Sequence, residues 1–258
     1  MRKIWVLKSL LKFENFILFL FFFLFPLFSV YFFSFLVEFL YKNFDLIKLK
    51  LYFNDTLSFL TIQYFVFFLL FYILFYFSKV KISFIKQQNW FYTLGEALFP
   101  ATFAFATGFL VTVLFVVAGD ILPIPAFIKD WIKMPNSGFV EIFNNLRGQN
   151  HFKVILWFLY IVALAPIIEE ILFRGFLQEF FAKLFKKTNF DIYLTALIFG
   201  AFHFSSLSNV VFAIVIGYFL SKERKLKNSI NISIWIHCII NFTGLLYGII
   251  MEFGKQTN

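Results

Sequence analysis

Seven polar or aromatic residues in the second half of the chain are candidates for one shared piece of chemistry. They are Glu169, Glu170 and Arg174 in the stretch EEILFR, Phe199 and His203 in FGAFH, and His237 and Asn241 in HCIIN. Each stretch lies within a run of apolar residues. Because an ionisable side chain inside a membrane costs about 3 kcal/mol even on lenient scales, we expect these groups to face the protein interior and to have a function.

The types of these residues suit hydrolysis of a peptide bond. That reaction needs a group that activates water, a group that carries protons and donors for the developing oxyanion. A carboxylate facing an imidazole can polarise water, and an imidazole with a side-chain amide can stabilise the oxyanion. The purely structural alternative is a neutral Glu170–Arg174 pair, with His237 and Asn241 linking helices by hydrogen bonds.

A zinc site is the alternative chemistry for the same residues. Glu169, His203 and His237 are a His/His/Glu set of the kind that holds catalytic zinc with water in the open position. The HExxH helix that is typical of other zinc proteases is absent from the sequence. We therefore favour a mechanism without a metal cofactor and retain zinc as the alternative.

The spacing of the candidates allows them to meet. The pairs Glu170 and Arg174, Phe199 and His203, and His237 and Asn241 are each four residues apart, which places each pair on one helix face. Counted from the charged flanks at about 1.5 Å per residue, the carboxylates, imidazoles and amide lie roughly 12 to 21 Å into the membrane. Three helices can therefore direct polar faces into one cavity.

The elements that carry these residues are membrane-spanning helices. Hydrophobic residues make up 61% of the 258 positions and charged residues 14%, against roughly half and a quarter in soluble domains. Phe alone occupies 46 positions, and no soluble core of this size hides so much apolar surface. The predicted fold class is an all-α polytopic transmembrane bundle that forms a single membrane domain over residues 1–258.

The hydropathy pattern predicts seven spans, with eight as the fallback. The three charge-free runs long enough to cross a bilayer are 16–37, 56–78 and 97–118. The run 154–185 contains the acidic pair, 190–203 and 209–220 are short runs that form a hairpin, and 229–250 is the last span. Pro166 is expected to kink the fourth span, and Gly200 allows a neighbouring helix to approach closely.

The formal charge of +9 is explained by membrane topology. Most of the 23 basic residues fall in the N-terminal segment and in loops on its side, if the first span is uncleaved and the N-terminus is cytoplasmic. This asymmetry requires no nucleic acid partner, and we expect an integral protein of a bacterial plasma membrane. The acidic residues outside the motifs flank spans or lie in loops, and we expect them to be solvated, Glu96 and Glu179 among them.

The third connecting loop, residues 119–152, contains Pro123, Pro125 and Pro135. Its segments 124–132 and 139–146 each place apolar residues on one helical face. We expect both segments to form helices that lie in the membrane interface on the outer side.

The motifs EExxxR, FxxxH and HxxxN, in this order and on separate spans, resemble the CPBP family of intramembrane proteases. That family includes the CAAX prenyl endopeptidases and the bacterial Abi or bacteriocin-processing proteins. The resemblance covers residues 154–250, which would be the catalytic core. It implies that Glu169 with His203 activates the water, that His237 and Asn241 hold the tetrahedral intermediate, and that Glu170 and Arg174 pair and orient.

The sequence therefore predicts an intramembrane endopeptidase whose partners are the lipid bilayer and a peptide or lipid-anchored protein tail. The substrate is either a CAAX-type tail or a bacteriocin or pheromone precursor. A proton-coupled transporter that uses the same Glu and His residues, or a non-enzymatic Abi-type immunity protein, are the alternatives. Cys238 follows His237 and points about 100° away from it on a helix, so we expect it to be an apolar filler rather than a nucleophile.

Overall fold

The part of the chain that the computed structural model describes comprises residues 90–132, 151–186, 188–203 and 205–256. The chain divides into two compact units, Met1–Lys81 and Ile82–Asn258, and the described residues all lie in the second. Every element in these ranges is helical, which agrees with the predicted all-α class. The predicted spans 16–37 and 56–78 and the predicted interfacial helix 139–146 lie outside the described residues.

Three of the described helices are long and apolar enough to cross a membrane. They cover Thr93–Ile121, Val154–Leu184 and Ile230–Met251. The first belongs to α5 (Trp90–Ile121) and the third to α13 (Ile230–Gln256). These helices confirm the predicted spans 97–118, 154–185 and 229–250, and the chain is an integral membrane protein.

The second of these long helices is a composite. It begins as α8 (His151–Leu159), passes through the π-helical segment η1 (Tyr160–Leu164), and continues as α9 (Ala165–Glu170). A second π-helical segment, η2 (Ile171–Leu177), leads into α10 (Gln178–Leu184). Such wide turns inside an α-helix are rare and are frequent at functional sites.

The predicted hairpin is present and consists of α11 (Phe190–Ala201) and α12 (Leu207–Lys227). The turn ends where the Ser206 hydroxyl caps α12 by accepting a hydrogen bond from the backbone N–H of Asn209 at 3.1 Å. A Cβ built on Gly200 would overlap Ile214 and lie 3.0 Å from the carbonyl of Val210, so the predicted close approach at this glycine is confirmed.

Helix α12 is longer than the apolar run 209–220 predicted. Its last turns are charged, and it ends at Asn228, which adopts the left-handed conformation with φ 48°. Ion pairs explain the extension, because Arg224 contacts Glu179 at 2.8 Å and Lys227 contacts Glu96 at 2.8 Å. The expectation that these two carboxylates are only solvated is therefore wrong, since they tie α10 and α5 to the end of α12.

Small residues allow α5 to pack closely against its neighbours. Ala97, Ala101 and Ala104 are fully buried on one face of α5, which contacts α12 and α13. The short helix α6 (Ala126–Ile132) confirms a helix within the predicted segment 124–132. Its Ile132 is buried and lies against Gly119, while Trp131 is half exposed.

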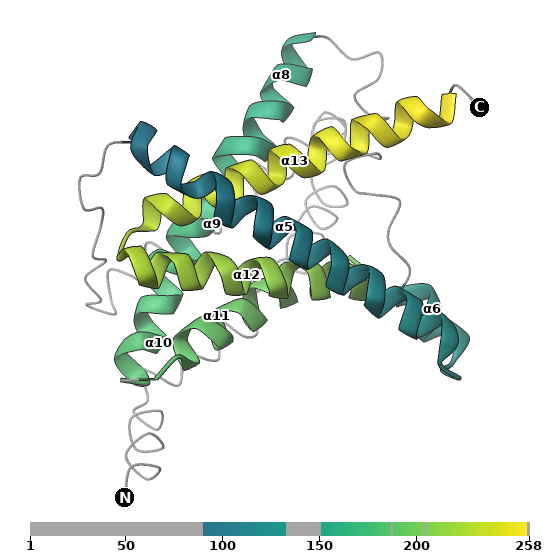
Figure 1. The fold of residues 1–258 in the computed structure, drawn as a ribbon, viewed down its shortest axis with the longest axis horizontal. Helices are drawn as coiled ribbons and strands as arrows, with labels where there is room; N and C mark the ends of the chain where they lie inside the picture. Colours follow the sequence, from purple (N-terminus) through teal and green to yellow (C-terminus); the bar gives the residue numbers. More distant parts are fainter. Residues whose placement is uncertain (1–89, 133–150, 187, 204, 257–258) are drawn as a thin grey trace, which may run out of the picture. The chain divides into compact units, whose positions relative to one another are not determined.

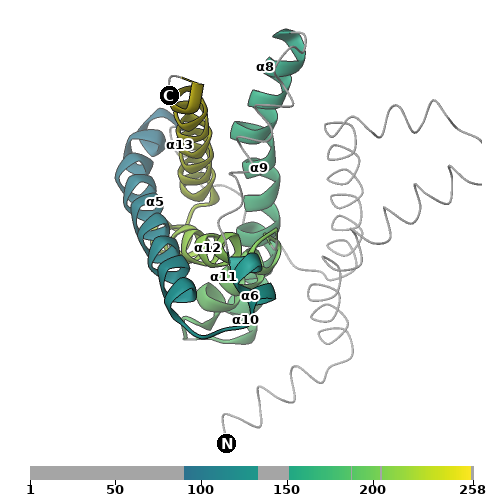
Figure 2. The same ribbon diagram turned by 90° about the vertical axis from the view of Figure 1, so that its right-hand side faces the viewer.

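The arrangement of these helices brings the three motifs together. Helix α12 contacts α5 on one side and α11 and η2 on the other, and α13 contacts α9, η1 and η2. Figure 1 shows α5 crossing both α12 and α13, and Figure 2 shows α12 between α5 and the composite helix. The core thus surrounds the point where α9, α11 and α13 approach.

Candidate active site

The composite helix positions the two acidic residues at a change of helical geometry. Pro166 lies at the start of α9 and lacks an N–H group, while the N–H of Ala165 bonds to the carbonyl of Tyr160, five residues back. The wider turn of η1 accommodates the proline at the place where the sequence predicts a kink. Glu169 and Glu170 then end α9, directly before η2.

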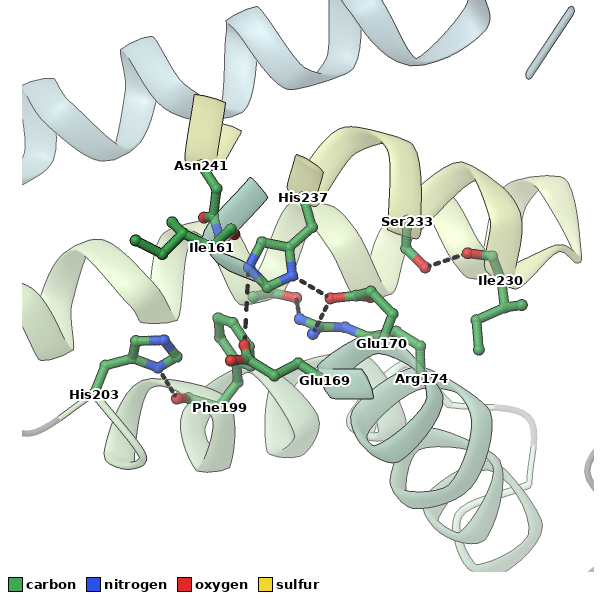
Figure 3. Close-up of polar contacts among 11 residues, drawn as sticks. Ile161, Glu169, Glu170, Arg174, Phe199, His203, Ile230, Ser233, His237 and Asn241 are labelled. Atoms are coloured by element: carbon green, nitrogen blue, oxygen red, sulfur yellow. Dashed lines mark hydrogen bonds and ion pairs between the residues drawn. The ribbon is translucent and has the colours of Figure 1, made fainter. Parts of the chain in front are cut away.

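Glu170 is the centre of a buried polar cluster. Its Oε1 accepts a hydrogen bond from Arg174 Nη1 at 2.8 Å, and the His237 Nδ1 lies 2.8 Å from the same oxygen. The side chains of Glu170 and Arg174 are both 0% exposed, and that of His237 is 5% exposed (Figure 3). One carboxylate therefore joins the first motif to the third across two helices.

Arg174 contacts groups from three elements. Besides its bond to Glu170, its Nη2 donates to the backbone carbonyl of Gly217 on α12 at 3.1 Å. The guanidinium also lies over the ring of Phe199 on α11, 4.4 Å from the ring centroid. A planar cation suits this combination of ion pair, hydrogen bond and aromatic face. Arg174 thus places a positive charge against the Glu170 carboxylate within the apolar core.

Glu169 lies on the more open side of the cluster. Its side chain is 14% exposed, and its Oε2 is 3.8 Å from His237 Nε2, the ring nitrogen that faces away from Glu170. That separation is too long for a direct hydrogen bond and is of the size that one water molecule can bridge. The two acidic residues therefore contact opposite nitrogens of one imidazole (Figure 3).

His203 follows the last turn of α11 and is oriented by its own backbone. Its Nδ1 lies 2.8 Å from the carbonyl oxygen of Phe199. Because a carbonyl only accepts, Nδ1 carries the hydrogen, and in the neutral ring Nε2 keeps a lone pair. The Phe199 ring contacts both imidazoles, with centroids 4.6 Å from His203 and 5.7 Å from His237. One aromatic ring thus separates and positions the two histidines.

Asn241 lies one turn beyond His237 on α13. Its Nδ2 donates to the carbonyl oxygen of Ile161 in η1 at 2.9 Å. A side-chain amide has two N–H donors, so one remains for another partner. The contact also explains how the π-helical segment serves the site, because it turns a backbone carbonyl toward α13.

The structure brings the sequence-predicted residues together to different degrees. Direct contacts join Glu169, Glu170, Arg174 and His237. Phe199 links His203 to this group by contacting both imidazoles. Asn241 is held near it on α13 by the hydrogen bond to Ile161. The pairing of Glu170 with Arg174 was predicted, whereas the bond from Glu170 to His237 was not.

Sequence reasoning missed three further residues that are buried or ion-paired, namely Gln178, Asp191 and Lys225. Gln178 and Asp191 are almost completely buried, and Asp191 Oδ1 accepts from Lys225 Nζ at 2.7 Å. A signal was present, since Gln178 continues the four-residue spacing of Glu170 and Arg174. Cys238, by contrast, behaves as predicted and packs in an apolar cluster with Ile230 and Ile234.

The metal alternative requires three ligands that converge. Within the described ranges, no three or more His, Cys, Asp and Glu side chains are arranged so that they could hold a metal ion. Glu170 Oε1 is already shared by a guanidinium and an imidazole. Glu169, His203 and His237 therefore do not converge as the three ligands of a zinc ion.

Comparison with known protein families finds one match, in the part of the chain that carries the three motifs. Residues 151–243 match the family model described as type II CAAX prenyl endopeptidase Rce1-like. This segment is similar to the Rce1-like family. All seven candidate residues of the three motifs fall within it, and the match confirms the resemblance to the CPBP family.

The match to the Rce1-like family indicates a general function. At family level it supports an intramembrane peptidase of the CAAX type, which acts on a peptide in contact with the bilayer. No curated protein and no solved structure matches the chain.

Proposed function

We propose that the protein is an intramembrane endopeptidase in which Glu169 and His203 activate a water molecule and His237 and Asn241 stabilise the oxyanion. The observation that carries this proposal is the buried Glu170, which orients His237 and leaves the opposite nitrogen of that ring toward Glu169. A bundle that needed only neutral cross-links between helices would not require two adjacent carboxylates at one imidazole.

The role of Glu170 follows from its two bonds. The Glu170 carboxylate accepts a hydrogen bond from the guanidinium of Arg174, and an ionised carboxylate only accepts hydrogen bonds. His237 Nδ1 therefore donates to Glu170, which fixes the ring orientation. The same logic applies to a carboxylate behind a catalytic histidine in other hydrolases. When both ring nitrogens carry a hydrogen, His237 also offers an N–H from Nε2.

The attacking water is placed beside Glu169. The Glu169 carboxylate accepts a hydrogen bond from the water, and Nε2 of His203, which carries no hydrogen, is a second acceptor on the neighbouring helix. The low exposure of Glu169 keeps the number of competing solvent molecules small. As the water oxygen forms a bond to the scissile carbonyl carbon, its proton moves to this acid–base pair.

The carbonyl oxygen of the substrate becomes an oxyanion in the same step. His237 Nε2–H and the remaining N–H of Asn241 are donors on one face of α13 that can stabilise this charge. The carbon–nitrogen bond then breaks, and the proton taken from water passes to the leaving amine. Water is consumed, and a carboxylate and a protonated amine are released, because both protons of the water end on the leaving nitrogen, so each side chain returns to its starting protonation state.

The substrate proposed is a membrane-associated protein or peptide tail. A CAAX-type tail carries its lipid anchor in the bilayer, and bacteriocin or pheromone precursors enter the bilayer through apolar segments. Either chain can approach a site that lies between lipid-facing helices.

Cleavage of reporter peptides by the full-length protein in proteoliposomes tests this proposal. We expect the wild-type protein to cleave a prenylated CAAX peptide or a bacteriocin-type precursor, and the Glu169→Ala and His203→Ala variants to lose at least about 10²-fold in rate. Cys238→Ala is the matched control on α13, because its side chain packs among apolar residues, and we expect full activity. A wild-type protein that cleaves neither peptide but carries out pH-driven flux that Glu169→Ala stops would contradict the proposal.

A further inference from the structure

A second group of polar residues lies directly behind the proposed catalytic residues. Gln178 is 0% exposed and Asp191 is 1% exposed, and neither takes part in the chemistry proposed above. Buried polar side chains in an apolar bundle are costly unless they are well bonded, so their retention requires a reason.

Gln178 repeats the contact that Arg174 makes one helical turn earlier. Arg174 donates to the carbonyl of Gly217, and Gln178 Nε2 donates to the carbonyl of Ser221 at 2.9 Å. The two donors are four residues apart on the composite helix, and the two acceptors are four residues apart on α12. They form two parallel cross-links between the same pair of helices.

A buried carboxylate joins the third helix to this pair. Gln178 Nε2 also lies 3.4 Å from Asp191 Oδ2 in the first turn of α11. The other oxygen of Asp191 accepts a hydrogen bond from Lys225 Nζ on α12 at 2.7 Å. Hydrogen bonds therefore connect α10, α11 and α12 at one point.

Apolar packing alone does not fix how these helices slide past one another. Dispersion contacts between Phe, Leu and Ile side chains are non-directional, whereas a hydrogen bond to one carbonyl is lost on a shift of one residue. The helices also approach closely here, since a Cβ on Gly217 would lie 3.1 Å from Phe199 Cδ1. A change in register would therefore displace Arg174 relative to the Phe199 ring.

We propose that Gln178 and Asp191 are positioning residues, which set the register of α10 on α11 and α12 and thereby hold Arg174 against Glu170. Lys225 is the cation that anchors Asp191 at the charged end of α12. The proposal rests on the proposed peptidase function, because the group positioned is the carboxylate that orients His237.

The first test compares kinetics of two neighbouring variants. Gln178→Met keeps the side-chain volume and removes both hydrogen bonds, and we expect kcat to fall about tenfold with KM within twofold, since no substrate contact is lost. Glu179→Gln is the matched control, because it weakens the Glu179–Arg224 ion pair between the same helices and leaves the Gln178 bonds in place. We expect wild-type kinetics for this control.

A spectroscopic measurement tests the proposal without requiring activity. In protein labelled with ¹⁵N-histidine, the His237 resonances are assigned by their loss in His237→Gln. We expect Gln178→Met to shift the ¹⁵N resonances of the His237 ring, and Glu179→Gln to leave them unchanged. If the wild type cleaves no peptide, the proposed function fails, and the His237 shift still decides whether Gln178 positions the cluster.

Asp191→Asn provides a second variant in case Gln178→Met does not fold. It keeps the shape of the side chain and loses the charge that holds Lys225. We expect its kcat and its His237 shift to lie between those of wild type and Gln178→Met. Unchanged His237 resonances in both variants, or equal kinetic losses in Gln178→Met and Glu179→Gln, would overturn the proposal.

Discussion

Two long helices of this protein are nearly equal in length and equally apolar, yet they differ in helical geometry and in the side chains that they bury. The helix over Thr93–Ile121 has 29 residues and that over Val154–Leu184 has 31. The first is a continuous α-helix that buries alanines and exposes large side chains such as Phe99 and Leu114. The second contains two π-helical segments and buries Glu170 and Arg174 completely.

Apolar character alone therefore does not distinguish a purely structural span from the span that carries the candidate site. In α5 the side chains that decide packing are small, and they are interchangeable as long as neighbouring helices can approach. In the composite helix the side chains that decide packing are polar, and each has a specific partner on another helix. Substitutions in the two helices should therefore have very different effects.

The largest effect is expected where the composite helix buries its charge. Arg174→Leu leaves the Glu170 carboxylate buried beside His237 without its cation, and we expect the free energy of unfolding to fall by about 3–5 kcal/mol. Equilibrium unfolding of the purified protein in mixed micelles measures this change.

A double substitution separates stability from catalysis at this pair. Replacing Glu170 and Arg174 together by Leu removes both charges, and we expect more than half of the lost stability to return while cleavage stays absent. If the double variant were as unstable as Arg174→Leu, the buried uncompensated charge would not be the cause.

An intermediate effect is expected at the closest helix contact next to the site. In Gly217→Ala the new methyl group would lie 3.1 Å from both Ala196 Cα and Phe199 Cδ1, so α11 and α12 must separate slightly. We expect a loss of roughly 1–3 kcal/mol in unfolding free energy. The thermal unfolding temperature in detergent measures it, and an unchanged temperature would argue against this close approach.

The smallest effect is expected in α5. A Cβ on Gly95 would meet no atom within 4 Å, so Gly95→Ala should change the unfolding free energy by less than about 0.5 kcal/mol and leave cleavage unchanged. The same thermal assay applies. A loss as large as that of Gly217→Ala would remove the contrast between the two helices.

Much of this architecture could be predicted from the sequence, because lipid imposes simple rules on it. Long apolar runs must be helices, and ionisable residues inside them must face inward, which located α5, α13 and the composite helix. The four-residue spacing of Glu170 and Arg174 placed them on one helix face and predicted their ion pair.

The partners between helices could not be predicted in the same way. Nothing in the local sequence indicates that His237 bonds to Glu170 while Glu169 faces the other nitrogen, because that choice depends on the rotation of α13 relative to α9. The π-helical segments change that rotation, and the sequence predicted a kink at Pro166 but no wide turns. The length of α12 was also underestimated, since ion pairs stabilise turns that hydropathy assigns to a loop.

The most direct test of the account is the contact between Glu170 and His237. In protein labelled with ¹³C at glutamate carboxyl carbons and ¹⁵N in histidine rings, solid-state dipolar recoupling reports carboxyl carbons close to the His237 ring. The 2.8 Å separation of Glu170 Oε1 and His237 Nδ1 predicts strong dephasing of the His237 Nδ1 signal, which Glu170→Gln without the label should greatly reduce, since Glu169 faces the other ring nitrogen. A His237 signal that shows no dephasing in folded wild-type protein would contradict the shared site on which the proposed peptidase mechanism depends.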